Sequence, residues 1–197
     1  MSETLRTLTG LGQDPVGLSG SVLIMIDCQN TYTRGVMELE GVGAALEEAA
    51  GLLERARSAG TPVIHIQHSA GPGSPYDIDA EIGAIVDAVA PRDGEPVVVK
   101  GYPNSFVHTD LDERLQAIGT SNLVLAGFMT HMCVNSTARG AFNLGYAPTV
   151  VAAATATRAL PGPDGGLVSA AALQSASLAA LSDLFAVVVP KAADVPD

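Results

Sequence analysis

Three residues able to support nucleophilic catalysis follow short apolar runs in this chain. Asp27 and Lys100 each end such a run, and Cys133 comes shortly after another. A thiol becomes a strong nucleophile as a thiolate, which a nearby cation and a helix N-terminus favour. A carboxylate within hydrogen-bond reach can take the thiol proton and later return it to a leaving group. The three residue types therefore predict a thiol-dependent reaction, provided that the fold brings them together.

Each of these residues also has a simpler interpretation when it is taken alone. Free cysteine is among the most buried residue types, so Cys133 could fill space under a helix. Asp27 could cap the loop after its strand, and Lys100 could be a solvated strand end. The second cysteine, Cys28, should point away from Asp27 and is interpreted as buried packing. Only the placement of all three residues at one edge of the fold would indicate a site.

The elements that would position these residues are β-branched apolar runs alternating with longer helical segments. The predicted strands are Ser21–Asp27, Pro62–His68, Pro96–Gly101, Asn122–Phe128, Pro148–Ala153 and Phe185–Pro190. The predicted helices cover residues 42–60, 109–119, 130–145 and 165–183. The first of these helices ends at Gly60, and the second begins with Thr109 as its N-cap.

This alternation predicts an α/β fold, a Rossmann-like three-layer sandwich with a six-stranded parallel sheet in the order 3-2-1-4-5-6. Ligands bind such sheets beyond the carboxyl ends of the strands, where the strand order reverses. Asp27 and Cys133 would then lie on opposite sides of one crevice. Lys100 would start about 10 Å from Asp27, a gap that a lysine side chain can largely close. The segment Gln67–Asp79, rich in Gly, Pro and Ser, is interpreted as a loop at the rim of this crevice.

Length and composition set the remaining expectations. The 197 residues, 47% of them hydrophobic, predict one domain over residues 1–197, with 1–20 as an N-terminal extension. The net charge of -11, without a Lys/Arg cluster, argues against a nucleic-acid or membrane partner. The first residues lack a basic start followed by an apolar core, and no apolar run approaches the roughly 20 residues that span a bilayer. We therefore expect a cytoplasmic protein.

Three blocks of the sequence resemble the motifs of the isochorismatase-like cysteine hydrolase superfamily. They are LIMIDCQNTY (Leu23–Tyr32), VVVKGYPNSF (Val97–Phe106) and LAGFMTHMCVNSTARGAFNLGY (Leu125–Tyr146). The third block is the most specific, because it combines Gly-x-x-Thr-x-x-Cys-Val with Thr-Ala-Arg and a Gly-Tyr helix end. The similarity extends from about Ser21 to Val189, and its motifs are most similar to those of streptothricin-hydrolase-like members.

The resemblance implies a catalytic triad of Asp27, Lys100 and Cys133. It also implies a non-proline cis peptide bond between Phe128 and Met129, and an oxyanion hole formed by the backbone N–H groups of Met129 and Cys133. It further implies a homo-oligomer, which we expect to be a homodimer or homotetramer. No organic cofactor is expected.

A metal site is not expected either. Nicotinamidases of this superfamily carry an Asp-x-His...His metal site after the second strand, whereas this chain has only His65 and His68 there. Three residues apart on a strand, the two histidines point to opposite faces. We interpret both as packing or rim residues.

The presence of Cys133 favours hydrolysis of a C–N bond (amide, lactam, imide or ureido) in a small molecule through a thioester. Residues expected to contact the substrate are Gln29, Tyr32, Asn104, Ser105, Phe106 and His131. One alternative is isochorismatase-type vinyl-ether hydrolysis by Asp27 without the thiol. Another is a non-catalytic Rossmann-like binding or scaffold protein, although no Gly-x-Gly-x-x-Gly follows the first strand.

Overall fold

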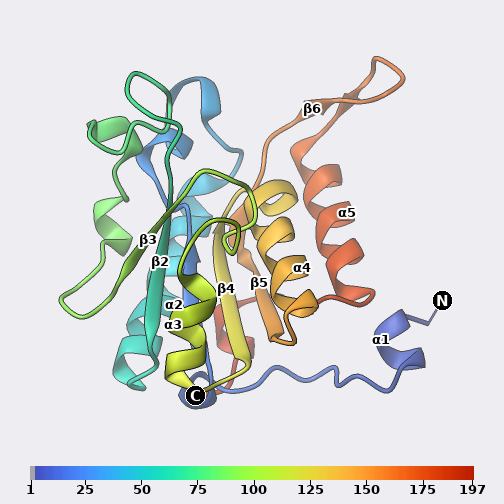
Figure 1. Cartoon of the computed structure of the whole chain (residues 1–197). Helices are drawn as coiled ribbons and strands as arrows, with labels where there is room; N and C mark the ends of the chain where they lie inside the picture. The colour runs from blue at the N-terminus through green and yellow to red at the C-terminus, as the bar shows by residue number, and fades with distance from the viewer. Residues whose placement is uncertain (1–2) are drawn as a thin grey trace.

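A parallel sheet forms the centre of the molecule, whose computed structural model describes residues 3–197 (Figure 1). Its six strands lie in the order β3-β2-β1-β4-β5-β8, and all five neighbouring pairs are parallel. The strands are β1 Val22–Ile26, β2 Val63–His68, β3 Val97–Lys100, β4 Asn122–Phe128, β5 Ala147–Ala156 and β8 Val187–Val189. This confirms the predicted fold class and strand order, with β8 as the sixth predicted strand.

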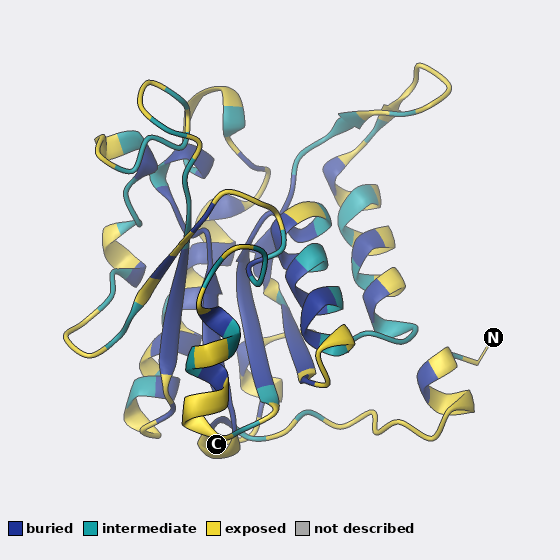
Figure 2. Cartoon of the chain, viewed as in Figure 1, coloured by how far each residue is buried: buried dark blue, intermediate teal, exposed yellow. Residues whose placement is uncertain are grey.

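Helices cover both faces of the sheet, as the sandwich architecture requires. The helices are α1 Leu5–Leu8, α2 Val42–Ser58, α3 Leu111–Ile118, α4 Asn135–Asn143 and α5 Ala170–Ser182. Helix α2 packs against one face, whereas α3, α4 and α5 pack against the other. Residues of β1 alternate between these two layers, and Figure 2 shows the strands buried between helices whose outer sides are exposed. Within residues 3–197, no helix combines the length and the apolar character needed to cross a membrane.

Short helical turns connect several of these elements. Five 3-10 turns lie before or between the strands and a sixth follows β8, at Leu18–Gly20, Asn30–Tyr32, Gly35–Met37, Glu81–Gly83, Asp87–Val89 and Ala192–Asp194. The expected N-cap of α3 is wrong by one residue, because Asp110 occupies that position. The Thr109 hydroxyl instead donates to the Ser105 carbonyl over 2.6 Å. This bond ties the start of α3 to the segment that leads away from β3.

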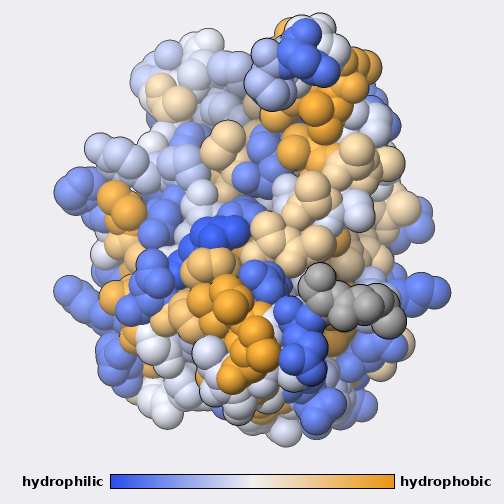
Figure 3. Space-filling view, turned by 90° about the vertical axis from the view of Figure 1, so that its right-hand side faces the viewer, coloured by the Kyte–Doolittle hydropathy of each residue, from blue (hydrophilic) through white to orange (hydrophobic). Residues whose placement is uncertain are grey.

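A two-stranded hairpin between β5 and α5 was not predicted. Its strands, β6 Leu160–Pro161 and β7 Leu167–Val168, are antiparallel and too short to give an alternating pattern. Figure 1 shows the hairpin projecting beyond the sheet, and Leu167 is 76% exposed. On this side of the molecule, hydrophobic areas are interspersed with hydrophilic ones (Figure 3).

Glycine at position 127 allows β4 to approach β1 closely at Ile26, the last residue of β1. Gly127 pairs with Ile26 and has a φ of +120°. A Cβ atom at this position would lie 1.9 Å from the Ile26 carbonyl oxygen. Only glycine adopts this backbone conformation readily and leaves room for the neighbouring strand.

We expect Gly127→Ala to lower the free energy of unfolding by at least about 2 kcal/mol, because the added methyl group meets the backbone of β1. Gly51→Ala is the matched control, since Gly51 lies in α2, where an added Cβ atom would have no neighbour within 4 Å. That substitution should raise stability by about 0.5–1 kcal/mol. Urea unfolding of both variants measures the difference, and equal stabilities would contradict this account of the strand contact.

Candidate active site

Asp27, Lys100 and Cys133, the three residues predicted to take part in catalysis, lie together at the carboxyl edge of the sheet. Lys100 Nζ lies 2.7 Å from Asp27 Oδ2 and 3.3 Å from Cys133 Sγ. Asp27 is fully buried, and Lys100 and Cys133 are only 2% and 4% exposed. The lysine side chain thus spans β2 to reach the end of β1, as the strand order predicts.

The three residues lie in different backbone conformations, which direct their side chains toward one another. Asp27 follows β1 with a φ of +49°, a left-handed conformation that Asp tolerates better than most residues. Lys100 is the last residue of β3. Cys133 lies in a π-helical turn, Thr130–Val134, rather than in the first turn of the α-helix, which begins at Asn135. Such turns frequently occur at functional sites, since they displace one residue from the regular helix.

Burial dominates the electrostatics of this cluster. It raises the pKa of Asp27 above its usual value, although the charge of Lys100 acts in the opposite direction. Burial, followed by the charge of Asp27, raises the pKa of the Cys133 thiol to about 12. The charge of Lys100 acts in the opposite direction but does not outweigh these two causes, so the resting thiol is protonated at neutral pH.

An aromatic wall continues from Lys100. His68 Nδ1 lies 3.1 Å from Lys100 Nζ, and the His68 ring contacts Tyr76 edge-on at 4.8 Å between centroids. Burial and the charge of Lys100 lower the pKa of His68 to about 4, so its ring is neutral at pH 7. Tyr76 belongs to the predicted loop segment 67–79, of which residues 69–79 form a loop, whereas Gln67 and His68 are the last residues of β2. The sequence pattern did not single out Tyr76.

The two histidines of β2 point to opposite faces, as predicted. His65 is 1% exposed and lies 3.0 Å from Glu95 Oε2 through its Nε2 atom, away from the cluster. Within residues 3–197, no group of three or more His, Cys, Asp or Glu side chains is arranged to hold a metal ion. Cys28 is 1% exposed within the apolar layer beneath α2, in keeping with its interpretation as packing.

Two of the six residues expected to contact a substrate lie near the cluster. The Tyr32 hydroxyl is 3.4 Å from the Tyr76 hydroxyl, and burial, followed by the charge of Asp27, raises the pKa of Tyr32. His131, in the turn that carries Cys133, has its Nδ1 atom 2.5 Å from Thr157 Oγ1. Thr157 directly follows β5 and was not predicted as part of the site.

The other four residues make contacts within the chain, and their contact with a substrate stays a prediction. The Gln29 amide is fully buried and donates to the carbonyls of His68 and Gly83 over 2.9 and 2.8 Å. Its oxygen accepts from the His68 N–H over 2.9 Å. Gln29 therefore holds the rim segments together and has no free amide hydrogen for a ligand.

Residues 104–106 pack against α4 and the residue that follows the turn after it. Ser105 is fully buried, and its hydroxyl lies 2.8 Å from the Thr137 hydroxyl. Phe106 stacks on Tyr146 with ring centroids 5.8 Å apart. A Cβ atom at Gly140 of α4 would lie 2.5 Å from the Asn104 amide nitrogen, so Asn104 packs directly on that helix. The segment after Lys100 thus fastens β3 to α4.

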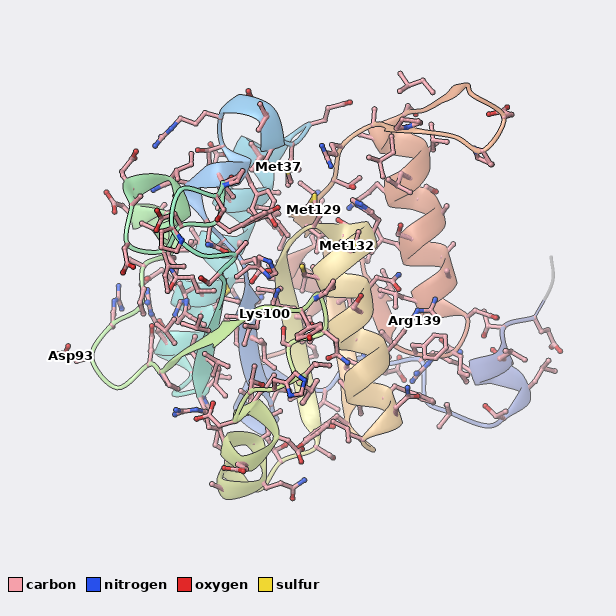
Figure 4. All side chains as sticks on the ribbon, turned by 45° about the horizontal axis from the view of Figure 1, so that its top comes forward. Met37, Asp93, Lys100, Met129, Met132 and Arg139 are labelled. Carbon is pink, nitrogen blue, oxygen red and sulfur yellow. The ribbon has the colours of Figure 1, made fainter. Side chains whose placement is uncertain are left out.

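The Phe128–Met129 peptide bond is cis, as the family resemblance implied. Among residues 3–197, the Met129 N–H has no hydrogen-bond acceptor. Figure 4 shows Met129, Met132 and Lys100 in the central part of the view, whereas Asp93 lies on an outlying loop. An unpaired donor is therefore available beside the turn that carries the thiol.

Comparison with known proteins agrees with this geometry. The sequence model of the Isochorismatase domain matches residues 21–193. The chain belongs to the isochorismatase family. Streptothricin hydrolase from Streptomyces noursei is 35% identical over 179 residues, which cover 88% of this chain and 63% of that protein. Maleamate amidohydrolase from Pseudomonas putida is 37% identical over 159 residues, which cover 72% of each chain.

A solved structure of this family is also similar along almost the whole chain. The crystal structure of an isochorismatase from Pseudomonas putida KT2440 has a TM-score of 0.94 and 38% identity. The match covers 98% of this chain and 99% of that one. These comparisons confirm the resemblance inferred from the three motif blocks, and they place this chain among isochorismatase-like cysteine hydrolases.

The raised pKa of Cys133 predicts how fast iodoacetamide reacts with it at different pH values. Only the thiolate is alkylated, so the rate should rise about tenfold per pH unit from about pH 7 to about pH 10. Mass spectrometry of the peptide that contains Cys133 measures this rate. The Cys133→Ser variant is the control, because any labelling that it shows must occur at the buried Cys28. A rate that is constant above neutral pH would contradict a protonated resting thiol.

Proposed function

We propose that this protein is a cysteine hydrolase that cleaves a C–N bond of a small molecule, in an amide, lactam, imide or ureido group, through a thioester on Cys133. The observation that carries the proposal is the buried contact of Lys100 with both Asp27 and Cys133. The similarity to maleamate amidohydrolase, whose name describes an amide hydrolysis, supports the choice of bond. In this proposal Asp27, Lys100 and Cys133 form the catalytic triad.

The first half of the proposed reaction forms the thioester. As Cys133 Sγ attacks the substrate carbonyl carbon, the thiol proton passes to Asp27. The carbonyl oxygen becomes an oxyanion that accepts hydrogen bonds from the N–H groups of Met129 and Cys133. Collapse of this intermediate breaks the C–N bond, and the departing nitrogen takes the proton from Asp27.

The second half releases the acid. Asp27 takes a proton from a water molecule, which attacks the thioester carbonyl. The C–S bond then breaks, and the proton passes from Asp27 to the departing sulfur, which restores the Cys133 thiol and the Asp27 carboxylate. Lys100 keeps Asp27 oriented and supplies positive potential beside the sulfur in both halves. Because the resting thiol is protonated, its proton is transferred during the attack rather than before it. The residues of this cycle require no metal or organic cofactor.

A second candidate is vinyl-ether hydrolysis with Asp27 as a general acid and no role for the thiol. This candidate needs a protonated Asp27 that can donate to an ether substrate, and the burial that raises the pKa of Asp27 acts in that direction, against the charge of Lys100. The likeness to the solved isochorismatase also supports it. The homodimer or homotetramer, the cytoplasmic location and the small-molecule partner remain predictions.

Substitution of Cys133 separates the two candidates. In a screen of small amides, lactams, imides and ureido compounds for released ammonia or amine, Cys133→Ala should lose at least about 1,000-fold in kcat. Quenching the wild-type reaction with acid should trap a thioester on the peptide of Cys133, which mass spectrometry detects.

Two controls accompany this experiment. Cys28→Ala should keep its activity, since Cys28 packs in the layer beneath α2. Asp27→Asn should be inactive in both candidate reactions. Full activity of Cys133→Ala on an amide would exclude the thioester, and activity retained only on an isochorismate-like ether would favour the second candidate. An inert thiol without turnover would support the scaffold interpretation.

A further inference from the structure

The ammonium group of Lys100 has a third neighbour besides Asp27 and Cys133. Its Nζ atom lies 3.1 Å from Nδ1 of His68, compared with 2.7 Å from Asp27 Oδ2 and 3.3 Å from Cys133 Sγ. A lysine ammonium carries three N–H donors and no acceptor. Lys100 is only 2% exposed, so a donor without an acceptor would be costly there. The three neighbours therefore match the three donors one to one.

The direction of this contact determines the protonation of the His68 ring. Because an ammonium can only donate, Nδ1 must accept, and the neutral ring then carries its proton on Nε2. Burial and the charge of Lys100 also keep the ring neutral, since they lower the pKa of His68 to about 4. His65 on the same strand makes a different contact, because its Nε2 atom lies 3.0 Å from the carboxylate of Glu95. The two histidines of β2 thus have partners of opposite charge.

The backbone and the ring of His68 are themselves held in place. Its N–H donates to Gln29 Oε1 and its carbonyl accepts from Gln29 Nε2, each over 2.9 Å, and Gln29 is fully buried. The His68 ring meets the Tyr76 ring edge-on, at an angle of 78°. His68 also pairs in register with Lys100 on the neighbouring strand. An acceptor that is fixed by such bonds and packing can in turn fix the donor bound to it.

We propose that His68 is a positioning residue, which accepts the third N–H of Lys100 and so keeps the other two directed at Asp27 Oδ2 and Cys133 Sγ. This role rests on the proposed function, in which Asp27 and Cys133 react. A neutral acceptor suits the task, because a carboxylate in its place would compete with Asp27 for the ammonium and add a negative charge beside the sulfur. An apolar side chain would leave one buried donor unpaired and the ammonium free to turn away from the sulfur, which is a weak acceptor.

The first test measures alkylation of Cys133 and does not depend on turnover. His68→Asn retains an acceptor oxygen at the position of Nδ1, whereas His68→Leu places a methyl group there. With iodoacetamide at about pH 8.5, Cys133 in His68→Leu should be labelled at least about threefold more slowly than in the wild type, because Lys100 is the cation that favours the thiolate. His68→Asn should be labelled within about twofold of the wild-type rate.

The second test measures turnover of an amide found in the screen by the same two variants. In His68→Leu we expect about a tenfold loss of kcat with KM nearly unchanged, since the acceptor holds groups that react rather than the substrate. His68→Asn should recover most of this loss.

His108→Asn is the control for both tests, because it removes an imidazole outside the cluster. The His108 ring packs on the exposed Tyr102 ring, with 5.4 Å between centroids. Asparagine tolerates the left-handed backbone conformation of His108, whose φ is +56°. This variant should keep the wild-type labelling rate and kcat.

A measurement on the wild-type protein covers the case in which His68→Leu fails to fold. Nitrogen-15 NMR distinguishes protonated from unprotonated imidazole nitrogens, and comparison with His68→Asn identifies the signals of His68. At about pH 7 the ring should be neutral, with its proton on Nε2. A proton on Nδ1 would overturn the inference. Wild-type labelling and kcat in folded His68→Leu would also overturn it, as would a loss that His68→Asn shares in full.

Failure of the proposed function gives a different set of results. If the wild type hydrolyses no compound of the screen, yet labelling falls in His68→Leu and returns in His68→Asn, the proposed function is contradicted and the positioning of Lys100 stands. If amides are hydrolysed through Cys133 and His68→Leu matches the wild type, the positioning role is overturned and the proposed function stands.

Discussion

The buried ion pair between Asp27 and Lys100 is the interaction on which the site depends. Removing two charges from water is costly, and the cost is offset only when the ions meet in good geometry. Here Asp27 follows the end of β1 and Lys100 is the last residue of β3. Strand β2 lies between these two strands and sets the distance that the lysine side chain must span. The close approach of β1 and β4 at Gly127 brings the turn with Cys133 beside the same pair.

This pair also determines the state of the nucleophile. In the low-dielectric interior, the negative charge of Asp27 and burial together outweigh the cation and keep the Cys133 thiol protonated. A neutral resting thiol protects a buried site from an additional unpaired charge. The Asp27 carboxylate disfavours the Cys133 thiolate at rest, and it is also the group placed to accept the thiol proton. One residue therefore both keeps the resting thiol protonated and can activate it.

Charge pairing differs between the two ends of the sheet. Near the start of β3, Glu95 is paired with Arg57 and His65, and the bond from Arg57 is the main cause that lowers the Glu95 pKa to about 2. At the carboxyl edge, the Nε–H group of Arg158, which follows β5 and Thr157, is buried without a hydrogen-bond acceptor among residues 3–197. The first arrangement stabilises the fold, because the charges of Glu95 and Arg57 are paired.

The sequence by itself determined the sheet, its strand order and the meeting of Asp27, Lys100 and Cys133 at one edge. The reason is that the pattern of apolar residues is local: it shows where each strand ends and which of its faces are buried. It did not show that Gln29 and Ser105 bond other parts of the chain, since polar side chains after a strand can bond either a ligand or distant groups of the protein. The predicted fifth strand ends at Ala153, whereas β5 continues to Ala156, so Thr157, which contacts His131, was not predicted as part of the site. Only the tertiary structure decided which polar groups found partners, because those partners come from segments far apart in the chain.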